Sequence, residues 1–361
     1  MNFLLYALAF LSSLHAYYFY EISLAFISVF ASFLLIMLLV LGKSGKFGFF
    51  SKGAVFFAGF YLLIYFWGCV GILFQGLNLD IKRSLGFVIL ILVFLGSSEL
   101  FRRINLITFS KFFLLTHSFF FYFQFFSFYA FGVTIDYLEP LTGEKQRMFG
   151  GSFQLPFLGN FMRPTGLFNE PGMYSAFIAP FTALMSRWYS SGKSEKFAYW
   201  ISLGSLVFSF SLFGTVFAML IFVFSAKVPK FFRLSFLSIT SIFAVPYVYY
   251  RFVVRQELGL SGGHQERGEL ISKFFESILE NPLNGIFGSH NILSPFSAQI
   301  DYVIAVNDVG LIFYLMLSLG LIIWVFVLIL LFFCMKKLDS SSRLAFFILL
   351  ISKQSLFCPF L

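Results

Sequence analysis

Apolar stretches recur along nearly the whole chain, and this pattern limits the fold more than any other feature of the sequence. Most of them are long enough to cross a bilayer as a helix, which takes roughly 17–25 residues. In hydrocarbon, helices and closed barrels satisfy every backbone N–H and C=O, and a barrel shows short alternating segments rather than apolar blocks. Only 11% of the residues are charged, against about 25% in soluble domains. The sequence therefore predicts an all-α, polytopic helical membrane protein.

We expect about 10–12 transmembrane helices in a single integral membrane domain that covers residues 1–361. They are expected near residues 3–20, 22–41, 54–74, 84–99, 107–132, 172–189, 197–226 (two helices), 234–250, 309–335 and 344–361. The N-terminus lacks the positive region and cleavage site of a removable signal peptide, so the first helix is expected to be retained. Two long polar segments, 133–171 and 251–307, interrupt the series.

The charge pattern decides how the apolar run 197–226 is interpreted, because this run is long for one upright helix and short for two. Splitting it around residues 209–214, with the N-terminus in the cytoplasm, places the basic loops on the cytoplasmic side, as the positive-inside rule requires. Those loops lie near residues 43–52, 102–103, 187–196, 227–233 and 336–343. The same topology places both long polar segments on the outer side of the membrane.

Composition also excludes several classes of site. The net charge of +9 is accounted for by the basic loops, so no nucleic-acid partner is expected. Cys69, Cys334 and Cys358 lie in apolar runs and form no disulfide or metal pattern. There is no Walker loop or zinc signature, and no internal repeat of the kind found in many transporters. We therefore predict no metal and no other cofactor.

The segment RPTGLFNEPG (163–172) is a polar, turn-rich stretch directly before an apolar helix. The planar guanidinium of Arg163 suits phosphate oxygens, and the N–H groups of the helix that follows add positive potential. The apolar residues 153–162 are too short to span, which favours a re-entrant or interfacial helix that brings Arg163 to the membrane surface. These features suit a pyrophosphate site, although an ordinary loop with a proline at the helix start explains them equally well.

The second polar segment offers further candidates. Arg251, Arg255 and Arg267 can hold a second anionic group, although Arg251 is explained more simply as a cap on the membrane end of the preceding helix. His264 and His290 are candidate bases, but single loop histidines are more often surface residues.

Helical spacing and intramembrane polar residues give two further predictions. Leu270, Phe274, Phe275, Ile278 and Leu279 predict an amphipathic surface helix, which ends in the segment 281–285. In the helix near 107–132, the polar residues are costly if they face lipid, so we expect them to face the bundle or a cavity. These residues are Lys111, His117 and Gln124, of which Lys111 is close enough to the cytoplasmic end to snorkel.

Asp308 directly precedes the helix near 309–335. A carboxylate at a helix N-terminus is often only a cap, and this interpretation competes with a role in orienting or deprotonating an acceptor.

Taken together, these segments resemble the signatures of the O-antigen polymerase and ligase superfamily. RPTGLFNEPG resembles the pattern R-x-[ST]-G-x-F-x-[EN]-P, and Arg267 followed by NPLNGIFG (281–288) resembles an arginine, a helix and N-P-L-x-G-x-G, with one extra residue. NDVG (307–310) followed by Gly320 and Leu321 resembles D-x-G…G-L. The segment SFSLFG (209–214) lies where the superfamily often has a serine-rich break.

The resemblance implies a glycosyltransferase of the membrane-embedded GT-C-like class in the bacterial inner (cytoplasmic) membrane, with its active site facing the periplasm. Such a polymerase joins oligosaccharide repeat units carried on undecaprenyl pyrophosphate, for O-antigen, capsule or exopolysaccharide, without a metal or nucleotide sugar. Its partners are the lipid-linked donor and acceptor, the lipid bilayer and a chain-length regulator.

The resemblance also assigns roles. Arg163 and Arg267, supported by Arg255 and Arg251, would bind the leaving pyrophosphate, and Asn169 and His264 would contact substrate. Glu170, His290 and Asp308 are the candidates on the acceptor side.

Two alternatives stay open. One is a ligase that transfers finished glycan to lipid A core or to protein. Ligases tend to carry a histidine near the start of the late helix, where this chain has Gln299, which favours the polymerase. The other is a polysaccharide transporter or flippase, for which paired charges at mid-membrane would be expected.

Overall fold

The computed structural model describes residues 2–11, 13–14, 17–19, 22–23, 27–28, 30–31, 34, 52–81, 84–85, 87–89, 91, 95, 104–149, 154–155, 159–160, 162–224, 231–232, 234–235, 238, 263–289 and 311–352. Within this part the helices are α1 (Asn2–Leu11), α3 (Lys52–Gln75), α5 (Leu106–Phe131), α6 (Glu139–Thr142), α7 (Pro171–Arg187), α8 (Lys193–Phe208), α9 (Leu212–Phe224), α12 (Gly263–Glu280), α13 (Leu283–Phe287), α15 (Leu311–Lys336) and α16 (Ser340–Ile351). Two short antiparallel strand pairs join them, β1 (Tyr18–Phe19) with β2 (Ile22–Ser23) and β3 (Gln154–Leu155) with β4 (Gly159–Asn160).

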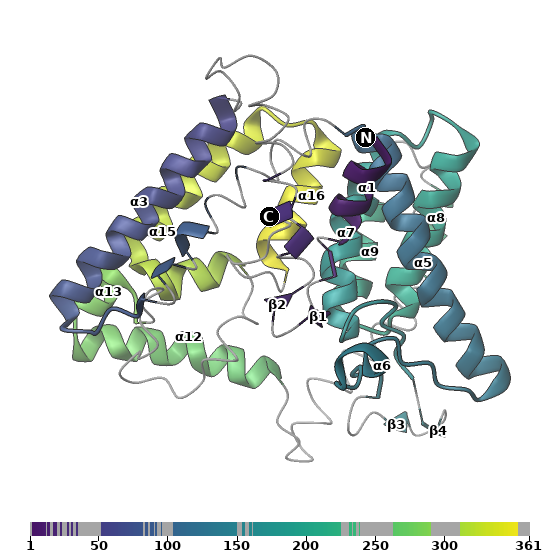
Figure 1. Cartoon of the computed structure of the whole chain (residues 1–361), viewed down its shortest axis with the longest axis horizontal. Helices are drawn as coiled ribbons and strands as arrows, with labels where there is room; N and C mark the ends of the chain where they lie inside the picture. Colours follow the sequence, from purple (N-terminus) through teal and green to yellow (C-terminus); the bar gives the residue numbers. More distant parts are fainter. Residues whose placement is uncertain are drawn as a thin grey trace.

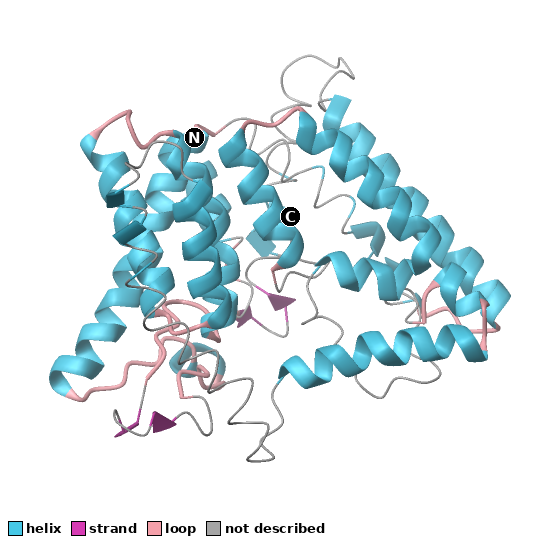
Figure 2. Ribbon diagram, turned by 180° about the vertical axis from the view of Figure 1, so that it is seen from behind, coloured by secondary structure: helices cyan, strands magenta, loops and turns pink. Residues whose placement is uncertain are grey.

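The helices form two packed groups (Figures 1 and 2). In the first, α7 contacts α5, α8, α9 and α16 around an apolar core that includes Phe113, Phe177 and Phe217. In the second, α13 and α15 pack with α3, and α12 joins them through Leu270 and Phe274. Helix α16 contacts both α7 and α15, so it connects the two groups.

Three of the described helices contain stretches long and apolar enough to cross a membrane: Ala58–Gln75, Leu106–Phe131 and Leu311–Lys336. Helices α9 and α16 are apolar but shorter. Large apolar side chains face outward on the long helices, for example Phe66 (67% exposed) on α3 and Phe119 (62% exposed) on α5. The predictions of apolar helices near 54–74, 107–132 and 172–189 are confirmed.

The break in the run 197–226 is present at the predicted place, between the end of α8 and Leu212. Phe210 there has a positive φ of 48°. Ser209 Oγ donates to the carbonyl oxygen of Leu206 (2.7 Å) and lies 3.3 Å from Ser175 Oγ in the first turns of α7. A hydroxyl that bonds to a nearby backbone carbonyl competes with the regular helical pattern, and here it helps to end α8.

The break places both described parts of the polar segments at one end of the molecule. In Figure 1, α6, β3, β4 and α12 lie at the lower end, and the α7–α8 and α15–α16 connections lie at the upper end. The residues of and beside these two connections include Arg187, Lys193, Lys196, Lys336, Lys337 and Arg343. The described basic turns and the described polar segments are therefore at opposite ends, which is the arrangement that the split predicts.

Three helix predictions were wrong. The helix expected at 3–20 ends at Leu11, and β1 and β2 follow, with Tyr18 opposite Ser23. Ser13 Oγ donates to the carbonyl oxygen of Phe10 (2.7 Å), a local bond of the kind that ends helices. The helix expected at 344–361 begins earlier, after the N-cap residue Asp339, and ends at Ile351.

The third wrong prediction is the re-entrant or interfacial helix at 153–162. The described residues there form the strand pair β3–β4, in which Gln154 is opposite Asn160 and Leu155 is opposite Gly159. Proline and glycine are poor helix formers, and the presence of both Pro156 and Gly159 in so short a segment disfavours a helix.

The late apolar helix is kinked at Gly320, whose φ of 77° and ψ of 173° are not helical. A Cβ at this position would overlap the carbonyl of Ile286 in α13, so close packing of the two backbones requires glycine here. Two indole N–H groups bond to carbonyl oxygens of the part of α15 before the kink: Trp67 Nε1 to Leu319 (3.1 Å) and Trp324 Nε1, from the part after the kink, to Ile312 (2.9 Å).

The packing of α13 against its neighbours accounts for several residues of the segment NPLNGIFG (281–288). Asn284 Nδ2 donates to the carbonyl oxygen of Ser277 (3.1 Å), and Gln75 Nε2 donates to the carbonyl oxygen of Gly288 (2.8 Å). A Cβ on Gly288, whose φ is 88°, would lie 2.5 Å from the carbonyl oxygen of Leu317. The helix that precedes it is present as α12. On its predicted apolar face Leu270 and Phe274 are buried, whereas Phe275 (50%) and Leu279 (85%) are exposed.

Candidate functional site

The segment 163–172 lies against the chain just after α6 and leads directly into α7. Arg163 N donates to the carbonyl oxygen of Met148 (2.9 Å), and Arg147 N donates to the carbonyl oxygen of Asn169 (2.7 Å). These two bonds pair the start and the end of the segment with neighbouring residues of the preceding chain. We call residues 146–148 and 163–170 together the signature loop.

Within the signature loop, the chain turns sharply between Thr165 and Phe168. Phe168 N donates to the carbonyl oxygen of Thr165 (3.1 Å), and Gly166 has a φ of 56°. A Cβ on Gly166 would lie 3.3 Å from the ring of Tyr174. The left-handed backbone and the nearby ring together account for glycine at the fourth position of the motif.

Two buried side-chain amides hold this turn against α5. Gln124 Oε1 accepts from the backbone N–H groups of Thr165 (2.9 Å) and Gly166 (3.0 Å). Gln146 Nε2 donates to the carbonyl oxygens of Gly166 (2.8 Å) and Phe168 (2.7 Å). The two amides also bond to each other, Gln124 Nε2 to Gln146 Oε1 at 2.9 Å. Both residues are buried, and bonds of this kind are needed to satisfy buried amides and backbone groups.

Gln146 is itself fixed by its neighbours. Its Oε1 also accepts from Tyr137 N (3.0 Å), and its backbone N–H donates to Asp136 Oδ2 (2.8 Å). Asp136 Oδ1 accepts from Leu138 N (2.8 Å) and from Glu139 N (2.9 Å). The amide pair, the turn and the start of α6 thus form one connected hydrogen-bond network.

Aromatic side chains of α5 and α7 pack against Phe168 of the signature loop. The ring of Phe168 lies 5.1 Å from that of Phe177 and 4.9 Å from that of His117. His117 is fully buried, and its Nε2 lies 3.2 Å from Ser13 Oγ. The prediction that His117 and Gln124 face the interior of the bundle is therefore confirmed.

Lys111 reaches the end of α5 as expected, and there its Nζ lies 3.0 Å from Glu195 Oε1. The hydrogen bond from Lys111 holds the pKa of Glu195 below its usual value. This pair joins the starts of α5 and α8, which lie at the end of the molecule opposite α6 (Figure 1).

Two charged groups of the signature loop, Arg147 and Glu170, lie at the N-terminus of α7. Arg147 Nη1 lies 4.0 Å from Glu170 Oε2, with the side chain of Arg147 77% exposed and that of Glu170 19% exposed. Glu170 is the N-cap residue, but its carboxylate does not cap the helix, and Pro171 follows it. Arg163 is half-buried at the other end of the loop.

The side chains of the loop also include two oxygens that make no hydrogen bond to a described residue. Within the described part of the chain, Thr165 Oγ1 and Asn169 Oδ1 are buried and have no hydrogen-bond partner. A half-buried arginine, an exposed arginine, a carboxylate and these oxygens can together bind an anion and orient a hydroxyl group.

The structure brings Arg163, Asn169 and Glu170 together in the signature loop. Arg267 and His264 belong to α12, whose described backbone lies at the same end of the molecule, but their side chains are outside the described residues. Arg251, Arg255, His290 and Asp308 also lie outside the described residues. No group of three or more His, Cys, Asp or Glu side chains suited to a metal ion occurs among the residues described.

Sequence reasoning assigned no role to Gln146 or to Arg147. Gln124 was expected to be buried, but its partner was not identified. A glutamine in an otherwise apolar helix was the available signal, because a buried amide requires partners nearby.

Comparison with known proteins gives no relative for this chain. No protein-family model matches it, and neither do curated proteins or solved structures.

Proposed function

We propose that this protein is a membrane-embedded glycosyltransferase. It polymerises undecaprenyl-pyrophosphate-linked oligosaccharide repeat units at the periplasmic face of the bacterial inner membrane. The resemblance of three segments to the polymerase and ligase superfamily motivates the proposal. The long apolar helices and the separation of the basic turns from the polar segments support it.

The observation that carries the proposal is the anchoring of the signature loop. Gln124 and Gln146 fix the backbone of the turn from a buried position, so the loop has a defined place at the N-terminus of α7. A preorganised cationic loop is what a reaction with an anionic leaving group requires.

In the proposed reaction, the hydroxyl at the non-reducing end of one repeat unit attacks the anomeric carbon of another. A new glycosidic C–O bond forms as the bond between that carbon and the pyrophosphate oxygen breaks, and lipid pyrophosphate leaves with the electron pair. Arg163, Arg147 and the N–H groups at the start of α7 stabilise the negative charge that develops on the leaving group. Arg267 and Arg255 are proposed to complete this cationic site from the second polar segment.

The proton of the attacking hydroxyl must pass to a base. We propose Glu170 for this role, because its carboxylate does not cap α7 and lies beside Arg147. His290 and Asp308 are the alternatives from the second polar segment. Asn169 is proposed to contact substrate through its buried oxygen.

The test is glycan chain length in cells that carry single variants of this chain. Arg163→Ala should lower polymer formation by roughly 100-fold or more, the loss typical of removing a transition-state donor, while the protein still reaches the membrane. Arg163→Lys should recover little, since a point charge does not replace a planar fork. Lys145→Ala is the matched control, because Lys145 is 77% exposed in the adjoining chain and pairs with Glu139 (3.4 Å).

The same experiment separates the alternatives. A polymerase variant leaves single repeat units, whereas loss of a ligase leaves long polymer on its lipid carrier. Normal chain lengths in Arg163→Ala would refute the proposed role of the loop.

A further inference from the structure

The basic end of the molecule contains a second feature, which is separate from the signature loop. A hollow of about 390 Å³ opens between α9, α15 and α16. Ligand sites in proteins typically have volumes of about 300–1,000 Å³, so this hollow can take part of an organic ligand. Its walls are mostly apolar and include Leu220, Phe332, Leu344 and Phe347.

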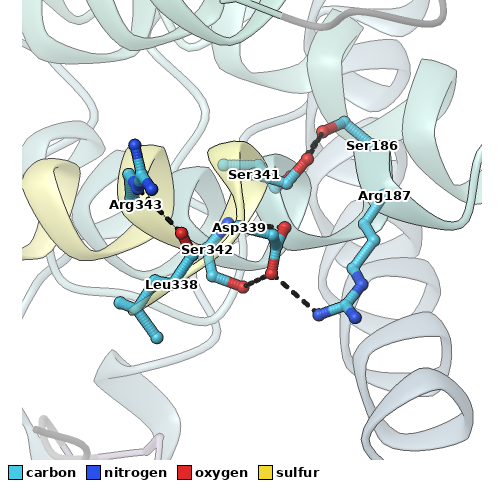
Figure 3. Close-up of polar contacts among 8 residues, drawn as sticks. Ser186, Arg187, Leu338, Asp339, Ser341, Ser342 and Arg343 are labelled. Carbon is cyan, nitrogen blue, oxygen red and sulfur yellow. Dashed lines mark hydrogen bonds and ion pairs between the residues drawn. The ribbon is translucent and has the colours of Figure 1, made fainter. Parts of the chain in front are cut away.

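Two cationic side chains complete the lining. Lys336 Nζ lies over the ring of Phe332, 4.8 Å from its centroid, which holds the ammonium group at the wall of the hollow. Arg343 donates from Nε to the carbonyl oxygen of Leu338 (2.7 Å) and from Nη2 to that of Lys336 (3.1 Å). These bonds use only part of the guanidinium's donors, and Figure 3 shows this arginine beside the α15–α16 turn.

The surroundings leave the hollow positively charged. The residues that line it, as far as the structure describes them, include no Asp or Glu. Asp339 in the adjacent turn bonds to Arg187 (2.8 Å) on α7, so its charge is already paired (Figure 3). Lys337 adds a further positive charge next to Lys336.

We propose that this hollow binds an anionic phospholipid from the leaflet at the basic end. One acyl chain lies between α9, α15 and α16, and the phosphate lies between Lys336 and Arg343. Apolar walls with cations at one end match the chemistry of such a lipid, and basic pockets between membrane helices are known to hold anionic head groups. The inference requires that the chain lies in a bilayer, and it does not depend on the glycosyltransferase proposal.

The test is lipid binding to the purified full chain in detergent, followed by native mass spectrometry. The probes are dioleoyl phosphatidylglycerol and dioleoyl phosphatidylcholine, which share their acyl chains and differ in net charge. We expect the anionic lipid to bind at least about fivefold more tightly, since the attraction of one Lys or Arg to a net negative head group, which phosphatidylcholine lacks, contributes about 1 kcal/mol.

Variants locate the site. Lys336→Gln should weaken binding of phosphatidylglycerol about fivefold, and Lys336→Arg should restore it. Lys337→Gln makes the same change of charge at the neighbouring position, which does not line the hollow, and should change binding less than twofold. Leu220→Trp should fill the hollow and reduce binding of both lipids, and the melting temperature without added lipid checks that each variant folds.

Three results would overturn the proposal. They are equal binding of the two lipids, equal losses in Lys336→Gln and Lys337→Gln, and displacement of the lipid by excess inorganic phosphate. The first excludes charge recognition and the second indicates diffuse attraction to the basic end. The third identifies a site for the free anion. None of these results bears on the reaction at the signature loop.

Discussion

Replacing Gln146 with leucine tests whether the buried amide pair fixes the signature loop. The substitution keeps the side-chain volume similar. It removes the bonds of the amide to Gln124 and Tyr137, and the two bonds to the loop carbonyl oxygens of Gly166 and Phe168. Each such bond contributes roughly 0.5–1.5 kcal/mol net, so the two together should lower the free energy of opening the loop by about 1–3 kcal/mol. The backbone N–H groups of Thr165 and Gly166 should then exchange with deuterium roughly 5- to 150-fold faster.

Hydrogen exchange followed by mass spectrometry measures this effect on the peptide that contains residues 163–168. Gln75→Leu is the matched control, because Gln75 makes similar bonds to Asn284 (3.3 Å) and Gly288 (2.8 Å) in the other packed group. It should loosen α13 and leave the signature loop unchanged. The reasoning fails if Gln146→Leu leaves exchange of the loop unchanged, or accelerates α7 and the loop equally.

Two further predictions concern packing and charge. Gly320→Ala should destabilise the protein by about 3 kcal/mol or more, because the residue needs a positive φ and a Cβ would overlap a backbone carbonyl. Gly59→Ala is the control: a Cβ there meets open space, so stability should change by no more than about 1 kcal/mol. Thermal unfolding measures both variants, and equal effects would contradict the requirement for glycine at the kink. Burial raises the pKa of Asp339, but hydrogen bonds from Ser342 and the charge of Arg187 more than offset it, so this pKa lies below its usual value. A carboxylate of this kind stabilises the fold above its unfolded pKa, near 3.9, and the benefit is lost as the pH falls through the lower folded pKa. Asp339→Ala should therefore lower the free energy of unfolding by about 1 kcal/mol at pH 7, because the N-cap of α16 is lost. The difference from the wild type should shrink below about pH 4. A difference in melting temperature that does not depend on pH would refute this prediction.

The sequence predicts the long helices well because their signal is local and strong. Helices α3, α5 and α7 follow from continuous apolar blocks with polar ends. The break between α8 and α9 was also predictable, because it decides on which side of the membrane the basic loops after it are expected to lie.

Two features that the sequence did not predict accompany contacts between residues distant in sequence. The kink at Gly320 depends on the carbonyl of Ile286, and the early end of α1 accompanies a contact of Ser13 with His117. Hydropathy along the chain does not encode such contacts, so it extends helices until a charge or proline ends them. The β3–β4 pair was missed although Pro156 and Gly159 were visible in the sequence.

For the candidate site, sequence adjacency explains what could be predicted. Arg163, Asn169 and Glu170 lie close together because they lie within one short segment. The partnership of Gln124 with Gln146 joins a helix to a loop and depends on the tertiary structure. The roles of the proposed site residues of the second polar segment, which lie outside the described side chains, remain predictions.

The amide pair at the centre of the site has a consequence for how the protein responds to acidity. Neither glutamine side chain gains or loses a proton in the range where proteins function. An anchor built from histidine or from paired carboxylates would weaken or strengthen as its surroundings became more acidic. The bonds that Gln124 and Gln146 make to the loop do not depend on protonation in this way, so they persist whether the surroundings are acidic or neutral.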